Sequence, residues 1–156
     1  METELFIGGK WLPASSGARF DVLDPATGDV IATVADGGES DAAAAVDAAA
    51  AAGPAWAKTP PRVRGEVLRK AWELMTARAD ELAKLISLEN GKALTDAKGE
   101  ITYAAEFFRW FAEEAVRGTG ELTTAPSGTN KVVVTPEGPR ILTLFPAQDL
   151  VVANPY

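Results

Sequence analysis

Residues 85–115 constrain the fold most, because they form the pattern of two helices with a sharp break between them. Gly91 lies at the break, where glycine can take the left-handed conformation that ends a helix. Thr95 or Asp96 is then expected to cap the second helix with a side-chain oxygen. Apolar residues recur in that helix at spacings of three and four: Ile101, Ala104, Ala105, Phe108, Phe111, Ala112 and Ala115. This spacing predicts one broad apolar face and favours two packed core helices.

The composition narrows the class of protein. The 156 residues are 47% hydrophobic and 24% charged, which is typical of a globular domain and argues against disorder. The formal net charge of −7 disfavours binding to nucleic acid or to an anionic membrane. No apolar run reaches the roughly eighteen residues of a membrane span, and the acidic start at residues 1–4 lacks the basic region of a signal peptide. We therefore expect a cytoplasmic protein with no nucleic-acid or membrane partner.

The sequence contains neither cysteine nor histidine. Disulfides, thiolate or imidazole metal sites, a cysteine nucleophile and a histidine base are all excluded, and we predict no metal site. The remaining candidates for chemistry are Glu89, Lys92 and Glu100, which flank the helix break. A buried acid there could have a shifted pKa, although helix capping and surface ion pairing are favoured. No phosphate-binding or nucleophile motif occurs, so the residues alone predict no active site.

Short antiparallel strands are predicted in residues 5–34. Leu5–Leu12 has the pattern of two extended pieces around a Gly8-Gly9 turn, and residues 20–23 and 30–34 form a second such pair. Residues 24–29 (DPATGD) connect the second pair. Their glycine spacing matches neither a phosphate-binding loop nor a calcium-binding loop, so a plain turn is favoured.

Ser40 is expected to cap an alanine-rich helix over residues 41–52, which Gly53-Pro54 would end. The alternative for this stretch is a low-complexity linker. Trp56 follows and is expected to anchor the turn into the core.

Residues 59–61 (TPP) open the next predicted helix, because proline is tolerated in a first turn. Its predicted buried stripe consists of Val63, Val67, Leu68, Ala71, Leu74 and Met75. A solvated face is favoured over an anion site for its basic residues, which are Arg62, Arg64, Arg69 and Lys70. Asp80 is expected to cap a further segment with four inward-facing residues, Leu82, Leu85, Ile86 and Leu88.

The C-terminal part predicts strands. Gly118 and Gly120 are expected to end the helical part, and residues 121–125 and 131–135 have the pattern of a hairpin with a five-residue loop. Its second strand contains Val132, Val133 and Val134 without polar alternation, so both faces are expected to be covered. Residues 141–145 (ILTLF) predict a buried strand.

Several of these stretches resemble the N-terminal part of the NAD(P)-dependent aldehyde dehydrogenase superfamily, and within it most closely the succinate-semialdehyde dehydrogenases and their relatives. The resemblance runs in order over about residues 5 to 140. It rests on FIGGKWL, SGARFDVLDPATGDVIATV, the alanine-rich stretch, PPRVRGEVLRKAWELMTARADELAKLISLENGK, YAAEFFRWFAEEA and GELTTAPSGTNKVVVTPEGP. The run Glu89-Asn90-Gly91-Lys92 before the long helix is part of it.

The resemblance implies an α/β fold: the N-terminal part of the aldehyde dehydrogenase fold, with most of the Rossmann-like sheet missing. It implies one incomplete domain over residues 1–156. Within it we expect short strands over 5–34, a helical layer over 40–117, a bridging hairpin over 121–135 and the first strand of the cofactor domain over 141–145.

The resembled family oxidises aldehydes to acids with NAD or NADP through a thiohemiacetal on a catalytic cysteine. This sequence has no cysteine, so we expect the chain alone to be inactive. In the family, a Pro-Trp-Asn-Phe-Pro segment after the first cofactor-domain strand touches the nicotinamide and holds the oxyanion. Residues 146–149 (PAQD) stand there if one inserted residue is allowed, which makes Pro146 and Ala147 candidates for cofactor binding and Gln148 a candidate for the asparagine role.

Gln148 is one methylene too long for a preorganised donor, and Asn154-Pro155 could match the motif only with a longer insertion. We expect neither to be functional. The resemblance also implies a partner, because the bridging hairpin of the family extends the sheet of a neighbouring subunit. We therefore expect a homo-oligomer, or association with a full-length aldehyde dehydrogenase subunit, through residues 121–135. A pseudoenzyme that serves as an interaction module and one half of a split enzyme are the alternatives.

Overall fold

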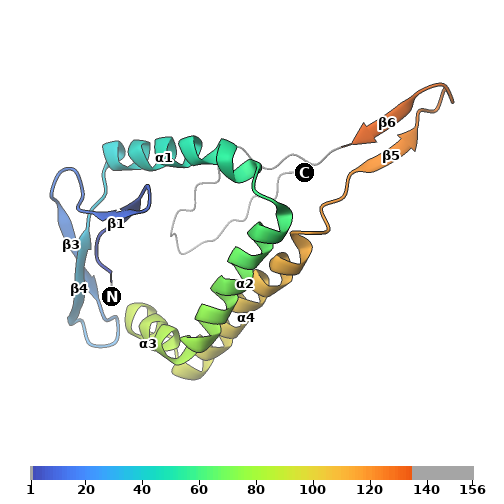
Figure 1. Ribbon diagram of the computed structural model, residues 1–156. Coiled ribbons are helices and arrows are strands. Elements are labelled where there is room, and N and C mark those ends of the chain that lie inside the picture. The colour runs from blue at the N-terminus through green and yellow to red at the C-terminus, as the bar shows by residue number, and fades with distance from the viewer. Residues whose placement is uncertain (1, 135–156) are drawn as a thin grey trace.

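The computed structural model describes residues 2–134, which form helices and short antiparallel strands (Figure 1). The strands are β1 (Leu5–Ile7), β2 (Lys10–Leu12), β3 (Arg19–Leu23), β4 (Val30–Ala35), β5 (Glu121–Thr124) and β6 (Lys131–Val134). The helices are α1 (Glu39–Ala57), α2 (Pro61–Ala77), α3 (Ala79–Asn90) and α4 (Leu94–Glu114). Two hairpins lie near the N-terminus, α1 leads from them to a layer of three helices, and the β5–β6 hairpin projects away from that layer. This mixture confirms the predicted fold class.

The N-terminal strands form the two predicted antiparallel pairs. Gly8 and Gly9 join β1 to β2 with φ values of 59° and 80°, a conformation that two-residue hairpin turns demand and that glycine adopts without strain. In the turn between β3 and β4, the Asp24 carboxylate accepts a hydrogen bond from the Ala26 N–H at 2.8 Å. This turn is an ordinary local one, as predicted.

Helix α1 is longer than expected at both ends, and the prediction that Ser40 caps it is wrong. The cap is Gly38, whose N–H donates to the Asp41 carboxylate at 2.9 Å, while Ser40 already lies inside the helix. The helix also continues through Gly53-Pro54. No residue of α1 is buried, and Trp56 is 50% exposed rather than anchored in a core. Among the described elements, α1 packs mainly on β1 through small side chains, which explains its thin buried face.

Helices α2, α3 and α4 form the main packed unit, in which α4 lies along both of the others. Gly65 brings α2 close to α4, because an added Cβ there would lie 2.7 Å from the Ala112 carbonyl oxygen. The core of this layer is small and consists of Ala83, Ala97, Ile101 and Ala105. Gly91 ends α3 in the left-handed conformation (φ 67°), and its N–H donates to the Ser87 carbonyl at 2.9 Å. This confirms the predicted break.

The predicted caps of α3 and α4 are wrong. Helix α4 begins at Leu94 after Ala93, so Thr95 and Asp96 lie within its first turn and no side chain caps it. Helix α3 follows Arg78, and Asp80 sits in the first turn. An acidic side chain there is already favoured by the helix dipole, and the Asp80 carboxylate pairs with the Lys98 ammonium at 2.7 Å instead of capping. Helix α4 also ends at Glu114, before the two glycines that were expected to stop it.

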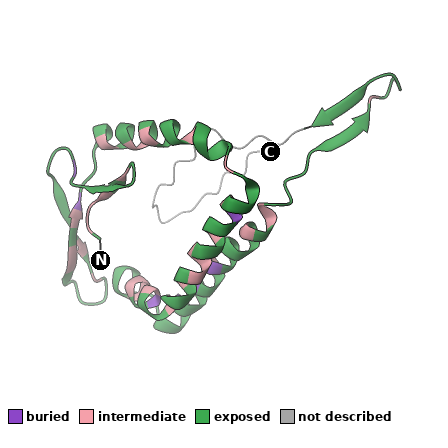
Figure 2. Cartoon of the chain, in the orientation of Figure 1, coloured by how far each residue is buried: buried purple, intermediate pink, exposed green. Residues whose placement is uncertain are grey.

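Much of the predicted apolar stripe of α2 is exposed (Figure 2). Leu68, Ala71 and Met75 are half-buried, whereas Val63, Val67 and Leu74 are exposed. Leu88 of α3 and Phe111 of α4 are exposed as well. Periodicity locates an apolar face, but within residues 2–134 these parts of it have no neighbouring element to cover them.

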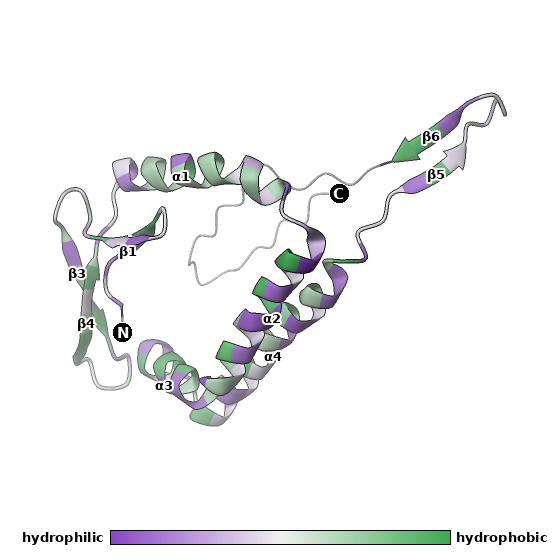
Figure 3. Cartoon of the chain, viewed as in Figure 1, coloured by the Kyte–Doolittle hydropathy of each residue, from purple (hydrophilic) through white to green (hydrophobic). Residues whose placement is uncertain are grey.

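The β5–β6 hairpin is confirmed, and every residue of its strands is exposed. Leu122 is 72% and Val133 68% exposed, so no part of the described chain covers this hairpin, and cover by a neighbouring subunit stays a prediction. Figure 3 shows the hydrophobic end of β6 on this projecting arm. The predicted strand over residues 141–145 lies outside the described residues. No helix in the described part of the chain has the length and apolar character of a membrane span.

Candidate functional site

The candidates beside the helix break form a surface ion pair. The Lys92 ammonium binds the Glu100 carboxylate across the turn that joins α3 to α4, and both side chains are substantially exposed. Glu89 lies exposed in the last turn of α3. The structure thus supports surface ion pairing here, and residues 2–134 contain no cluster of three or more acidic side chains able to hold a metal ion. Pro146, Ala147, Gln148 and Asn154-Pro155 lie outside the described residues, so their roles stay predictions.

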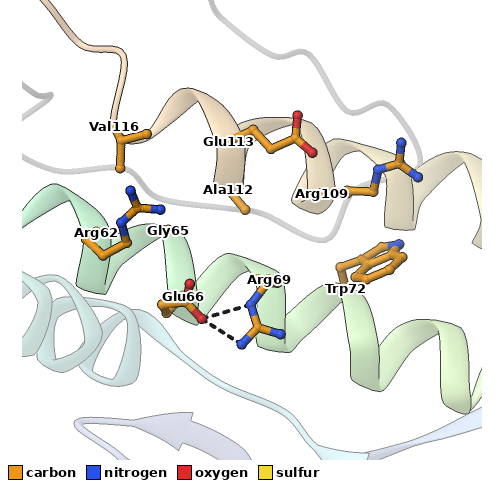
Figure 4. Close-up of a pocket in the computed structure, with 9 residues that line it drawn as sticks. All are labelled: Arg62, Gly65, Glu66, Arg69, Trp72, Arg109, Ala112, Glu113 and Val116. Carbon is orange, nitrogen blue, oxygen red and sulfur yellow. Dashed lines mark hydrogen bonds and ion pairs between the residues drawn. The ribbon is translucent and has the colours of Figure 1, made fainter.

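A hollow with a volume of about 390 Å³ lies between α2 and α4 (Figure 4). Its lining comes from both helices and the residues just after α4: Arg62, Gly65, Glu66, Arg69, Trp72, Arg109, Ala112, Glu113 and Val116. Gly65 lies in this lining at the point where the two helices approach most closely, since an added Cβ would meet the Ala112 carbonyl oxygen at 2.7 Å. Sequence reasoning assigned Arg62 and Arg69 to a solvated face and missed this hollow. A glycine about two turns before Trp72 in an amphipathic helix was the available signal.

One ion pair within the hollow joins two of its charged side chains, Arg69 and Glu66. The Arg69 guanidinium donates two hydrogen bonds to the Glu66 carboxylate, at 2.6 and 2.8 Å, and also pairs with Glu73. The hydrogen bond from Arg69, and then its positive charge, lower the pKa of Glu66. Arg109 lies with its guanidinium carbon 6.0 Å from the centre of the Trp72 ring, the outer limit of a cation–π contact.

This arrangement can hold two helices together but offers no catalytic chemistry. None of the lining residues is a hydroxyl or amine nucleophile next to a base, which nucleophilic catalysis would require. The three guanidinium groups face two carboxylates, and the ion pairs are solvent-exposed, so each contributes little to stability. We regard the hollow as part of the α2–α4 packing.

The projecting hairpin offers a surface of a different kind. Its strands pair antiparallel, with Leu122 opposite Val133 and Thr123 opposite Val132. Both outer edges keep unpaired backbone groups among the described residues, since the sheet has only these two strands. A two-stranded sheet of this kind is marginal alone and readily accepts a further strand.

Known proteins resemble this chain over most of its length. The model of the Aldehyde dehydrogenase family matches residues 11–142. A succinate-semialdehyde dehydrogenase of Paenarthrobacter nicotinovorans is 50% identical over 115 residues, which are 72% of this chain and 26% of that protein. The NADP(+) succinate-semialdehyde dehydrogenase of Escherichia coli (strain K12) is 41% identical over 131 residues, which are 84% of this chain and 27% of that protein. The chain therefore spans about a quarter of these relatives.

Solved structures agree with the sequence comparison. An NADP-dependent enzyme of E. coli superposes with a TM-score of 0.81 at 40% identity, covering 85% of this chain and 27% of that one. The succinate-semialdehyde dehydrogenase of Burkholderia pseudomallei gives a TM-score of 0.78 at 42% identity, over 82% and 27% of the two chains. Betaine aldehyde dehydrogenase of Staphylococcus aureus, solved in complex with NAD+, gives 0.78 at 27% identity, over 80% and 26%. The family match and these superpositions lead to one conclusion: the chain belongs to the aldehyde dehydrogenase family.

Proposed function

We propose that this chain is the N-terminal structural segment of a semialdehyde dehydrogenase that oxidises an aldehyde of the succinate-semialdehyde type to its acid with NAD or NADP. The observation that supports this most is the identity of 41–50% to succinate-semialdehyde dehydrogenases over most of the chain. In this proposal the segment supplies framework and contacts, and the reacting groups come from other parts of the enzyme.

The residues present explain why the segment alone should be inactive. The family reaction needs a thiolate to form the thiohemiacetal, and this sequence contains no cysteine. Dinucleotide sites of the Rossmann type lie at the carboxyl ends of neighbouring parallel strands. All three sheets among residues 2–134 are two-stranded and antiparallel, so the described residues do not fit the cofactor.

The exposed apolar side chains support a framework role. Large hydrophobic residues lie exposed on all three helices of the layer, with Val63 and Val67 on α2, Leu88 on α3, and Tyr103 and Trp110 on α4 among them. Apolar surface of this extent marks a contact region. We infer that these faces pack against the rest of an aldehyde dehydrogenase subunit, since the part of this chain that superposes on the E. coli NADP-dependent enzyme covers only 27% of that relative.

The hairpin supports a second contact, with another subunit. Its valines are exposed, and the backbone groups at its edges are unpaired among the described residues. Addition of a strand from a partner would bury the valines and give those backbone groups hydrogen-bond partners. We propose that β5 and β6 mediate self-association or association with a full-length subunit. A pure interaction module is the alternative function that this observation favours.

Assay and calorimetry of the purified chain test the inactive-segment proposal. We expect no reduction of NAD+ or NADP+ with succinate semialdehyde, and no heat of cofactor binding on titration. A matched assay of the E. coli relative provides the positive control. Saturable cofactor binding or turnover by this chain would contradict the proposal.

A further inference from the structure

The corner between α3 and α4 (residues 90–93) contains an Asn–Gly dipeptide, which can react without an enzyme. Asn90 is followed by Gly91, and the other two asparagines, Asn130 and Asn154, are followed by lysine and proline. A glycine after an asparagine has no side chain to shield its own backbone nitrogen. In an Asn–Gly sequence this nitrogen therefore attacks the asparagine side chain most readily. The reaction needs no enzyme and no cofactor.

We propose that Asn90 is a site of spontaneous deamidation that alters this corner. The Gly91 backbone nitrogen attacks the Asn90 Cγ, a new C–N bond closes a five-membered succinimide, and the side-chain amide leaves as ammonia. Water then opens the ring at either carbonyl and gives aspartate or isoaspartate. The atoms balance with water as the only co-reactant, and nothing is oxidised or reduced.

The structure leaves both reacting groups within reach of this chemistry. Asn90 is the last residue of α3 and is exposed, and its side chain makes no hydrogen bond within residues 2–134. The attacking nitrogen is held by one hydrogen bond, from the Gly91 N–H to the Ser87 carbonyl at 2.9 Å. Attack requires only that the terminal turn of α3 open, and helix ends fray more readily than helix interiors.

Both products, aspartate and isoaspartate, are expected to destabilise the corner. A carboxylate at residue 90 would stand at the negative end of the α3 dipole, where an anion is unfavourable. Isoaspartate would also lengthen the backbone by one methylene next to Gly91. This glycine sits close to Pro25 of the β3–β4 turn, since an added Cβ would lie 3.1 Å from the proline Cγ. We therefore expect conversion to loosen the contact between the helical layer and that turn.

Peptide mapping by mass spectrometry tests the site directly. The full chain is incubated near neutral pH at physiological temperature, and the deamidated fraction is followed at Asn90 and at Asn130. Asn130 is the internal control, because it is also exposed but precedes Lys131. We expect Asn90 to convert first and its product to include isoaspartate. Equal conversion at the two asparagines would overturn the proposal.

Two variants separate the chemistry from its consequence. Asn90→Gln keeps a side-chain amide but disfavours the five-membered ring. The mass gain that deamidation causes in this peptide should therefore disappear. A mass gain that persisted would show that Asn90 is not the site. Asn90→Asp imitates one product and should unfold at a lower temperature than Asn90→Gln. An Asn90→Asp variant as stable as Asn90→Gln would contradict the proposed effect of the charge on the corner.

Discussion

The helical layer and the β5–β6 hairpin contain comparable shares of apolar residues but differ in what covers them. In the layer, α4 packs against α2 and α3 and buries Ala97, Ile101 and Ala105. In the hairpin, Leu122 and all three valines of β6 are exposed. The layer therefore has local stability of its own, whereas the hairpin gains stability only by contact with something else. The difference separates a packed unit from an exposed surface.

Loss of the one large buried side chain in the layer should have the largest effect on stability. Ile101 is 8% exposed and packs with Ala83 and Ala97. We expect Ile101→Ala to lower the free energy of unfolding by about 2–4 kcal/mol, because burial is lost and a cavity remains. Chemical denaturation followed by circular dichroism measures this. Leu122→Ala in the hairpin is the matched control and should change the same quantity by less than about 0.5 kcal/mol. Equal effects would remove the distinction between the two regions.

Close approach of α2 and α4 gives the second prediction. Gly65→Ala places a Cβ 2.7 Å from the Ala112 carbonyl oxygen, so the helices must separate. We expect a loss of about 1–3 kcal/mol in the free energy of unfolding. Gly99→Ala is the control on α4, because no atom lies within 4 Å of its added Cβ. That variant should gain about 0.5–1 kcal/mol from helix propensity. A stabilised Gly65→Ala protein would show that the close contact is wrong.

A smaller effect is expected at the start of α1. Hydrogen bonds to the Asp41 carboxylate, first from the Gly38 N–H and then from Ser15, lower its pKa below the ordinary value of 3.8. A folded-state pKa below the unfolded one gives stability that is present above about pH 3.8 and is lost as pH falls through the folded-state value. Asp41→Asn should therefore reduce the melting temperature near neutral pH and lose its difference from the parent in strong acid. A difference that grew on acidification would contradict this assignment.

A charged substitution in the β5–β6 hairpin should have the smallest effect on folding stability and the largest effect on association. Val133→Lys alters an exposed residue, so we expect the free energy of unfolding to shift by less than about 0.5 kcal/mol. If the hairpin joins subunits, the same change places a charge in the contact and should reduce the oligomer measured by sedimentation velocity. Thr123→Lys, on the partner strand and without loss of an apolar side chain, is the comparison. An unchanged oligomer with both variants would place the interface elsewhere.

Backbone conformation at glycine turns was predictable from the sequence, whereas the burial of side chains was not. Gly91 and the Gly8-Gly9 turn were placed correctly because positive φ angles leave few alternatives to glycine. The caps at Ser40 and Asp80 were placed wrongly, because several polar residues near each helix start could serve and tertiary partners decided among them. The hollow beside Gly65 was missed because the side chains that line it belong to helices separated by α3 in the sequence.

Exposure of the predicted apolar stripes has a physical reason as well. A spacing of three and four residues shows which face of α2 is apolar but carries no information on what lies opposite that face. Val63, Val67 and Leu68 share the α2 pattern. Leu68 is half-buried, whereas the two valines are exposed. The family relation supplies the missing part of the explanation, because the relatives contain much more chain than this segment.

Exchange of segments between this chain and a relative tests whether the chain can serve as the N-terminal part of an aldehyde dehydrogenase. A chimera would carry residues 5–140 of this chain in place of the matching N-terminal part of the E. coli succinate-semialdehyde dehydrogenase, to which it is 41% identical over 131 residues. We expect a folded chimera of the parent's oligomeric state that reduces NADP+ with succinate semialdehyde. The same chimera with Ile101→Ala should be less stable. A chimera that fails to fold or to assemble under conditions in which the parent does both would contradict the claim that this segment is a structural part of such an enzyme.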